Sequence, residues 1–192
     1  MNERVAAELR SHDVLFSCEG KCEAVIMKRL LENDRLVLSA DEVVHDDEHG
    51  TPYTLLRKAP DIERTFMGVE YDKGPLLIAR IVDSDPGSFV LSRARRNDAI
   101  VRDFVTSPEI EALTLIKEGR YDDWRRRHHG KGRQLNASNY CVQVLGMSQV
   151  KQYRFLLDYW SDVNELVACI LTYQSKQGKR KDRTLGLADL LR

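Results

Sequence analysis

Apolar residues in the first two-thirds of the chain follow two alternating patterns. Apolar runs of strand length cover residues 13–18, 36–38 and 75–82, and residues 99–105 look like another strand. Residues 22–31, 61–67 and 108–118 instead carry apolar side chains at helical spacing. The run at 75–82 is almost continuously apolar, which is typical of a strand buried on both faces of a parallel sheet. Residues 53–57 fit a strand or a helix equally well. This alternation predicts a layered α/β fold.

Beyond Gly119 the strand pattern disappears. Helical spacing predicts helices over 121–127, 137–144, 150–159 and 163–173, followed by a short last helix over 185–191. We therefore expect an open, mostly parallel sheet flanked by helices over residues 1–118, with a helical extension over 119–192 packed on it.

The composition changes this picture little. The chain has 192 residues, 42% of them hydrophobic, and its 30 basic residues balance 30 acidic ones. A basic excess would favour nucleic-acid binding, and here the basic residues instead form local runs at 93–96, 120–133 and 176–183, each of which also fits a solvated surface. No N-terminal stretch resembles a membrane helix or a signal peptide, so we expect a cytoplasmic protein without a membrane partner. The four cysteines lack zinc-site spacing and fit free thiols.

Two acidic motifs follow predicted strands. Glu19-Gly20 ends the first strand and runs into a helix, and Asp83-Ser-Asp85 ends the most buried strand. If these parallel strands are neighbours, the three carboxylates meet at one sheet edge. Residues two apart in extended chain point to the same side, so Asp83 and Asp85 can address one metal ion. Carboxylates this close repel unless a cation joins them, and Mg²⁺ or Mn²⁺ suits oxygen ligands. The alternative is that Asp-x-Asp before Pro-Gly only forms a turn.

These motifs resemble those of Toprim domains. The segment 16–31, with Glu19-Gly20 between a strand and a helix, is similar to the first Toprim motif, and Ile81-Val-Asp83-Ser-Asp85-Pro-Gly87 is similar to the Asp-x-Asp motif. Toprim domains occur in topoisomerases, bacterial primases and the overcoming-lysogenization-defect (OLD) nucleases. The resemblance covers about residues 11–118. The chain has no evident nucleophilic tyrosine and no zinc ribbon, so it looks like a stand-alone unit closest to the OLD-like branch.

The resemblance implies specific roles. Glu19, Asp83 and Asp85 would hold Mg²⁺, with Glu19 also serving as an acid–base group. In the OLD-like branch, later carboxylates and a lysine take part, and Glu109, Glu111 and Lys131 fit those roles. Glu109 and Glu111 also fit ordinary helix-start chemistry.

A basic segment in the predicted helical extension offers a site for phosphates. Arg125, Arg126, Lys131 and Arg133 are the residues expected to contact nucleic acid, because cations neutralise charge on a reacting phosphate. A solvated loop is the alternative. Neighbouring aromatic residues at helical spacing fit the core better than base stacking.

Together these features predict Mg²⁺- or Mn²⁺-dependent phosphoryl transfer on nucleic acid. The leading hypothesis is an OLD-like endonuclease that cleaves DNA or structured RNA, with a separate ATPase as a possible partner by analogy. Two alternatives stay open: an inactive Toprim-like binding or regulatory module, and nucleotidyl transfer of the primase kind.

Overall fold

A parallel sheet forms the centre of the first part of the chain. The computed structural model describes residues 2–83, 89–106, 109–128, 135–177 and 184–192. Within these residues, three strands pair in the order β1 (Val14–Cys18), β2 (Leu76–Val82) and β3 (Ala99–Val105), all parallel. Val14 lies opposite Leu77, and Leu76 lies opposite Ala99. The predicted α/β class with a parallel open sheet is therefore confirmed.

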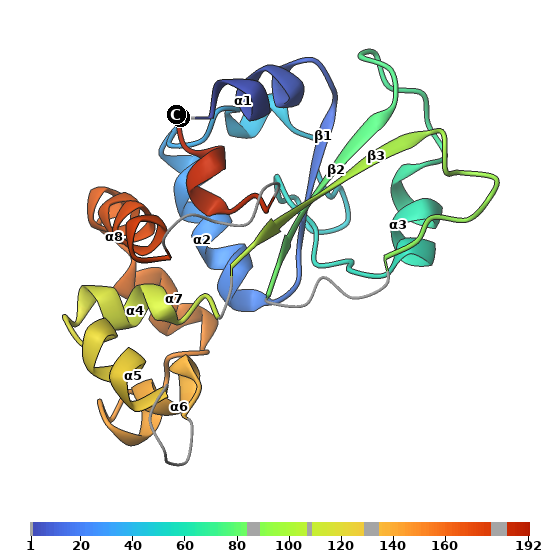
Figure 1. The fold of residues 1–192 in the computed structure, drawn as a ribbon. Coiled ribbons are helices and arrows are strands. Elements are labelled where there is room, and N and C mark those ends of the chain that lie inside the picture. Colours follow the sequence, from blue (N-terminus) through green and yellow to red (C-terminus); the bar gives the residue numbers. More distant parts are fainter. Residues whose placement is uncertain (1, 84–88, 107–108, 129–134, 178–183) are drawn as a thin grey trace.

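Each face of the sheet is covered by a different set of helices (Figure 1). Alternate residues of β1 and β2, such as Phe16 and Ala79, pack into the larger core with α1 (Glu3–Arg10) and α2 (Lys21–Glu32). The intervening residues, such as Leu15 and Ile78, pack with α3 (Ala59–Phe66) in a smaller core. Both strands are buried along their whole length, which explains why the sequence shows continuous apolar runs there.

The helices after β3 form the second part of the molecule. They are α4 (Ala112–Lys117), α5 (Tyr121–His128), α6 (Ala137–Gln143), α7 (Tyr153–Tyr159) and α8 (Val163–Lys176). Buried residues of these helices belong to the same hydrophobic cluster as those of β1 and α2, and α7 packs against α2. One side chain joins three of the helices: Lys117 Nζ lies 2.9 Å from Glu165 Oε2, donates to Tyr159 O at 2.6 Å and lies 4.0 Å from the Tyr159 ring centre.

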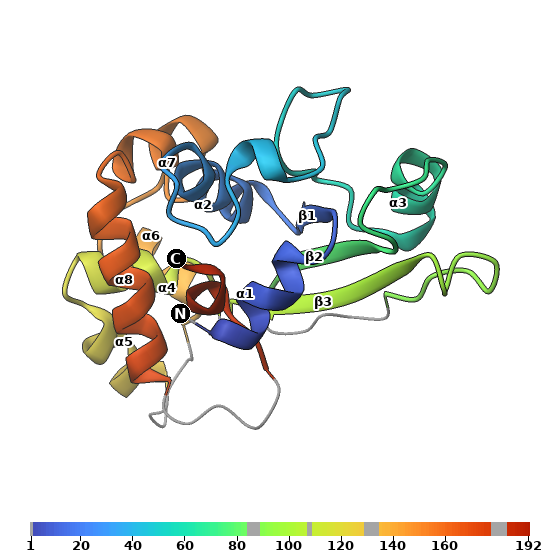
Figure 2. The ribbon, with the colours of Figure 1, turned by 90° about the horizontal axis from the view of Figure 1, so that it is seen from above.

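The last residues return to the sheet. Leu185 bridges to Phe104 at the edge of β3, and the 3-10 helix η2 (Leu187–Leu190) lies beside α1 (Figure 2). Asn2 Nδ2 donates to Asp189 Oδ1 at 3.0 Å, so the two ends of the chain lie close together. None of the helices within the described ranges combines the length and apolar character needed to cross a membrane.

Several predicted elements need correction. Residues 36–38 form no strand: all three are buried, but Leu36 makes only an isolated bridge to Leu191. The apolar run at 36–38 is therefore buried by core packing and not by strand pairing in a sheet. Residues 53–57 form neither strand nor helix, although Thr54 bridges to Ser17, and Ala40–Glu42 forms a 3-10 turn, η1. Helix α1 has no counterpart among the predicted elements, and α4 begins at Ala112 instead of 108.

Candidate metal and phosphate site

The carboxyl ends of β1 and β2 bring Glu19 and Asp83 together. Glu19 N donates to Ile81 O at 3.0 Å, which extends the ladder past the end of β1. In return, Asp83 N donates to Glu19 Oε2 at 2.8 Å. This pair of hydrogen bonds fixes the Glu19 carboxylate at the sheet edge where parallel α/β folds bind their ligands. Asp85, the third predicted carboxylate, lies outside the described residues.

The segment between β3 and α4 brings two further carboxylates to the same edge. Glu111 is the N-cap residue of α4 and is 7% exposed. Glu109 accepts a hydrogen bond at 2.9 Å from the backbone N–H of Ser138, in the first turn of α6. Burial raises the pKa of Glu109, and the Glu111 and Asp83 carboxylates add to this, while the Ser138 hydrogen bond opposes it. Glu109 and Glu111 both lie in the turn before α4.

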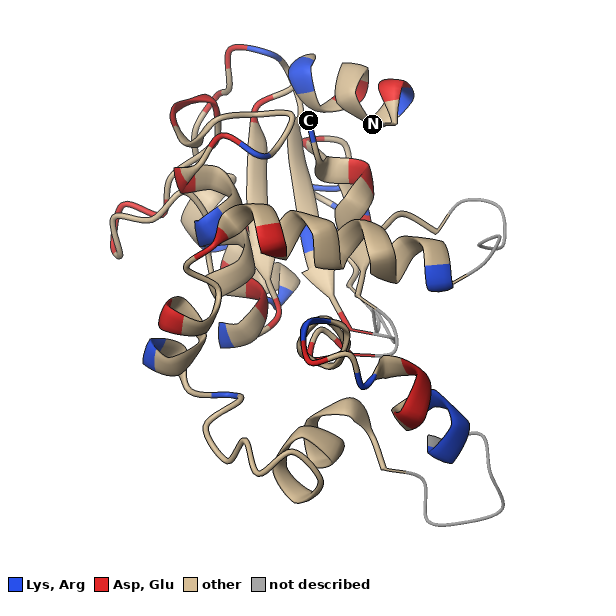
Figure 3. Ribbon diagram, turned by 90° about the vertical axis from the view of Figure 1, so that its left-hand side faces the viewer, with Lys and Arg blue, Asp and Glu red and all other residues tan. Residues whose placement is uncertain are grey.

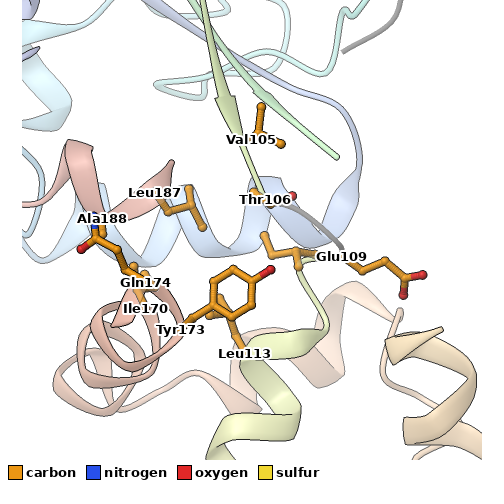
Figure 4. A pocket seen from close by; sticks show the side chains of 10 residues that line it. Val105, Thr106, Glu109, Leu113, Ile170, Tyr173, Gln174, Leu187 and Ala188 are labelled. Carbon is orange, nitrogen blue, oxygen red and sulfur yellow. The ribbon is translucent and has the colours of Figure 1, made fainter. Parts of the chain in front are cut away.

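Figure 4 shows how the Glu109 side chain is placed. Its stem lines a small apolar pocket between the end of β3, α4, α8 and η2, with Leu113 and Ile170 among the lining residues. The carboxylate points away from that pocket. The pocket encloses about 10 Å³, which leaves room for one water at most. Apolar packing thus holds the stem and directs the charged end toward the acidic residues.

Glu23, in the first turn of α2, is a carboxylate that the sequence analysis missed. It is 8% exposed, and burial raises its pKa to about 7, helped by repulsion from Glu111, Glu19 and Asp83. Gly20 makes room for it, because a Cβ at position 20 would lie 2.9 Å from Glu23 Oε2. Glycine at the N-cap of α2 therefore lets a fifth carboxylate approach the end of β1.

Lys151, which precedes α7, provides a cation beside these acids. Its Nζ lies 3.4 Å from Glu111 Oε1. Burial works against the charged ammonium, but the Glu111 carboxylate together with Cys22 and Glu109 outweighs it, so the pKa of Lys151 is raised. The Cys22 thiol lies 3.9 Å from the same Glu111 oxygen, and burial together with Glu111 and Glu23 raises the pKa of Cys22 to about 12. Cys22 is therefore a neutral thiol at neutral pH.

These side chains line a single open cleft of about 440 Å³, which we call the acidic cleft. Its carboxylates come from the ends of β1 and β2, the start of α2 and the turn before α4, and its cations from both parts of the molecule. The carboxylates are Glu19, Glu23, Asp83, Glu109 and Glu111; the cations are Lys21, Arg57 and Lys151; Asn136 also lines it. Negative charge therefore exceeds positive charge among the described lining residues, which favours a cation as the first ligand.

The donor chemistry of the acidic cleft fits Mg²⁺ or Mn²⁺. All its acidic groups offer oxygen, the ligand that these hard ions prefer, and Mg²⁺ keeps several waters when one or two carboxylates bind it. Over the described ranges, no three acidic, histidine or cysteine side chains are close enough to ligate one ion directly. Glu19, Asp83, Glu109 and Glu111 are the described residues that would hold an ion, partly through water.

The predicted nucleic-acid residues lie elsewhere or outside the described chain. Lys131 and Arg133 belong to an undescribed segment. Arg125, on α5, donates to Lys176 O at 2.9 Å, and Arg126 forms an ion pair with Asp123, so neither lines the acidic cleft. Acidic and basic residues are interspersed over the ribbon (Figure 3).

The aromatic residues near that basic segment are in the core. Tyr121 is 4% exposed and Trp124 2%, and Tyr140 is fully buried. Trp124 Nε1 donates to Leu135 O at 2.8 Å. Base stacking by these rings is excluded, as the helical spacing indicated.

Two residues of the cleft left different traces in the sequence. Glu23 stands four residues after Glu19, in the first turn of the predicted helix. That position lies close to the end of the first strand, so the sequence does carry a signal for Glu23. Lys151 gave no such signal, because only tertiary packing brings the segment before α7 to Glu111.

Comparison with models of known protein families, with curated proteins and with solved structures yields no match to this chain.

Proposed function

We propose that this protein catalyses divalent-cation-dependent phosphoryl transfer on nucleic acid, most simply the hydrolysis of a phosphodiester bond in the manner of an OLD-like Toprim nuclease. The observation that carries the proposal is the meeting of Glu19, Asp83, Glu109 and Glu111 in one cleft beside Lys151. These residues come from four separate segments. A turn-forming role for Asp83 alone would require none of the others to be there.

The bound cation would supply Lewis-acid polarisation of the phosphodiester and a more acidic water. The protein's own groups do the rest. Lys151 neutralises negative charge that develops on the phosphoryl oxygens, and the backbone N–H of Asp83 orients the Glu19 carboxylate. Glu23 is suited to proton exchange, because its pKa of about 7 allows both protonation states at neutral pH.

A second candidate is the inactive Toprim-like binding module. The internal partners of the carboxylates favour it, since Ser138 N occupies one oxygen of Glu109 and Lys151 neutralises Glu111. In this alternative the cleft still binds a cation, but its interactions serve structure or regulation and no phosphodiester is cleaved.

Activity assays separate the two candidates. The full chain is incubated with Mg²⁺ or Mn²⁺ and single-stranded DNA, duplex DNA or tRNA, alongside Glu19→Gln, Asp83→Asn and Lys151→Gln variants. Glu70→Gln is the matched control, because Glu70 is exposed near the opposite end of β2. We expect cleavage by the wild type and by Glu70→Gln, and at least a 100-fold loss in the cleft variants.

The folded state of each variant is checked by thermal denaturation. Cleavage retained by a folded Glu19→Gln or Asp83→Asn variant removes that residue from the proposed site. No cleavage of any substrate by the wild type, with cation binding intact, favours the binding module instead.

A further inference from the structure

Two cations on the α/β side of the acidic cleft lack an ion-pair partner among the described residues. Lys21 is the first residue of α2 and Arg57 follows the segment that runs beside β1, and both side chains are exposed. Five carboxylates line the same cleft, yet neither cation pairs with any of them in the described part of the chain. Lys151, across the cleft, does pair with Glu111 at 3.4 Å. Lys21 and Arg57 are therefore available to a ligand outside the protein.

The backbone that carries Arg57 is held firmly against β1. Thr54 N donates to Phe16 O at 2.8 Å, and Cys18 N donates to Thr54 O at 2.9 Å. Ser17 Oγ then donates to Leu56 O at 2.8 Å, one residue before Arg57. This support fixes the backbone at Arg57, so that its exposed side chain starts from a defined place on the wall of the acidic cleft.

The placement of the two cations indicates the class of ligand. The carboxylates form an acidic floor in this cleft, and Lys21 and Arg57 form a basic edge. This arrangement suits a polyanion, which contacts the floor through a bound cation and contacts the edge directly. A nucleic-acid strand has further phosphates on either side of the one at the floor, so it can meet the acidic floor and the basic edge at the same time. Guanidinium and ammonium groups bind such phosphates without regard to base sequence.

We propose that Lys21 and Arg57 form a phosphate-binding rim, which contacts backbone phosphates flanking the phosphodiester at the floor of the acidic cleft. This inference rests on the proposed function, because it takes nucleic acid as the ligand. Lys151 and Asn136 line the cleft from the helical part. The strand accordingly lies between the two parts of the molecule, with Lys21 and Arg57 on the α/β side.

The test measures binding of the full chain to a fluorescent DNA strand and to the matching duplex by anisotropy, in Mg²⁺ and in Ca²⁺, over a series of KCl concentrations. The variants are Lys21→Gln and Arg57→Gln. Lys73→Gln is the control, since Lys73 is an exposed lysine before β2, at the opposite end of the strands. Lys21→Arg and Arg57→Lys keep the charge and test whether charge alone is required.

Each glutamine substitution should weaken binding about fivefold near physiological salt, equally for different base sequences. It should also make the slope of log affinity against log salt shallower by about 0.7 for the single strand or 0.9 for the duplex. The charge-retaining variants should keep the wild-type slope, and Lys73→Gln should behave as wild type. In cleavage assays, the KM of the glutamine variants should exceed that of the wild type, while kcat stays unchanged.

The outcomes distinguish this inference from the proposed function. Mg²⁺-dependent cleavage with an unchanged salt slope in both glutamine variants overturns the rim and leaves the proposed function standing. A rim-dependent slope without cleavage supports the rim and contradicts the proposed hydrolysis. If the wild type binds neither the strand nor the duplex, the rim is wrong.

Discussion

Replacing Glu23 with glutamine removes the most perturbed carboxyl group of the acidic cleft while keeping its shape. Burial and the neighbouring carboxylates raise the pKa of Glu23 from 4.5 to about 7. The folded state therefore holds this proton more tightly than the unfolded chain does. Stability from this proton is fully present below pH 4.5 and is lost as the pH rises through about 7.

The size of the effect follows from the same values. The interval between 4.5 and about 7 corresponds to about 3 kcal/mol of unfolding free energy, at about 1.4 kcal/mol for each tenfold change in proton affinity. Glutamine cannot ionise, so the Glu23→Gln variant escapes this loss. We expect it to match the wild type at pH 4.5 and to exceed its stability by at most about 3 kcal/mol at pH 8.

Urea denaturation of both proteins at intervals from pH 4.5 to 8 measures this difference. Thermal unfolding provides a second readout, with a Tm gain at pH 8 of at most roughly 6–12 °C for a chain of this size. Carboxyl groups outside the acidic cleft titrate equally in both proteins, so the difference reports Glu23 together with the cleft carboxylates coupled to it. A difference that stays constant across this pH range, or a variant that is less stable at pH 8, would refute the reasoning.

Three further predictions concern individual side chains. Gly20→Ala should displace the Glu23 carboxylate, so that stability falls less steeply between pH 4.5 and 7 in denaturation series. Lys151→Gln should cost less than about 1 kcal/mol of stability by urea titration, because its ion pair with Glu111 is largely exposed on the lysine side, yet abolish most phosphodiester cleavage. Lys117→Met should lower the unfolding free energy by about 1–3 kcal/mol in the same titration, because it loses contacts to both α7 and α8.

Strands β1 and β2 were predictable because both are buried along their whole length. The continuous apolar run at 75–82 corresponds to β2 with almost the same ends, and β3 covers the predicted 99–105 although only Phe104 in it is fully buried. The strand expected at 36–38 is absent because an apolar run indicates burial and not strand pairing as such. At 36–38 the burial comes from packing beside η2. Helix α1 was not predicted because it has 8 residues and only Val5, Ala6 and Leu9 are buried, which gives too few apolar positions for a clear helical period.

The candidate site was predictable where it follows from strand ends. Parallel neighbours place the residues after β1 and β2 at one edge, so Glu19 and Asp83 could be paired from the sequence. The contribution of Lys151 could not, because it depends on how the helical part packs against α2 and α4. A basic segment at 125–133 looked more suitable for phosphate, but Arg125 and Arg126 make local contacts on α5 and α8.

Calorimetric titration of the wild-type chain with Mn²⁺ at pH 7.5 tests the central claim most directly, because it measures cation binding without requiring a substrate. The account predicts saturable binding that Glu19→Gln and Glu111→Gln greatly weaken and that Glu70→Gln leaves unchanged, with protons released as the cation lowers the pKa of Glu23. Absence of saturable binding, or equal binding in all four proteins, would contradict it.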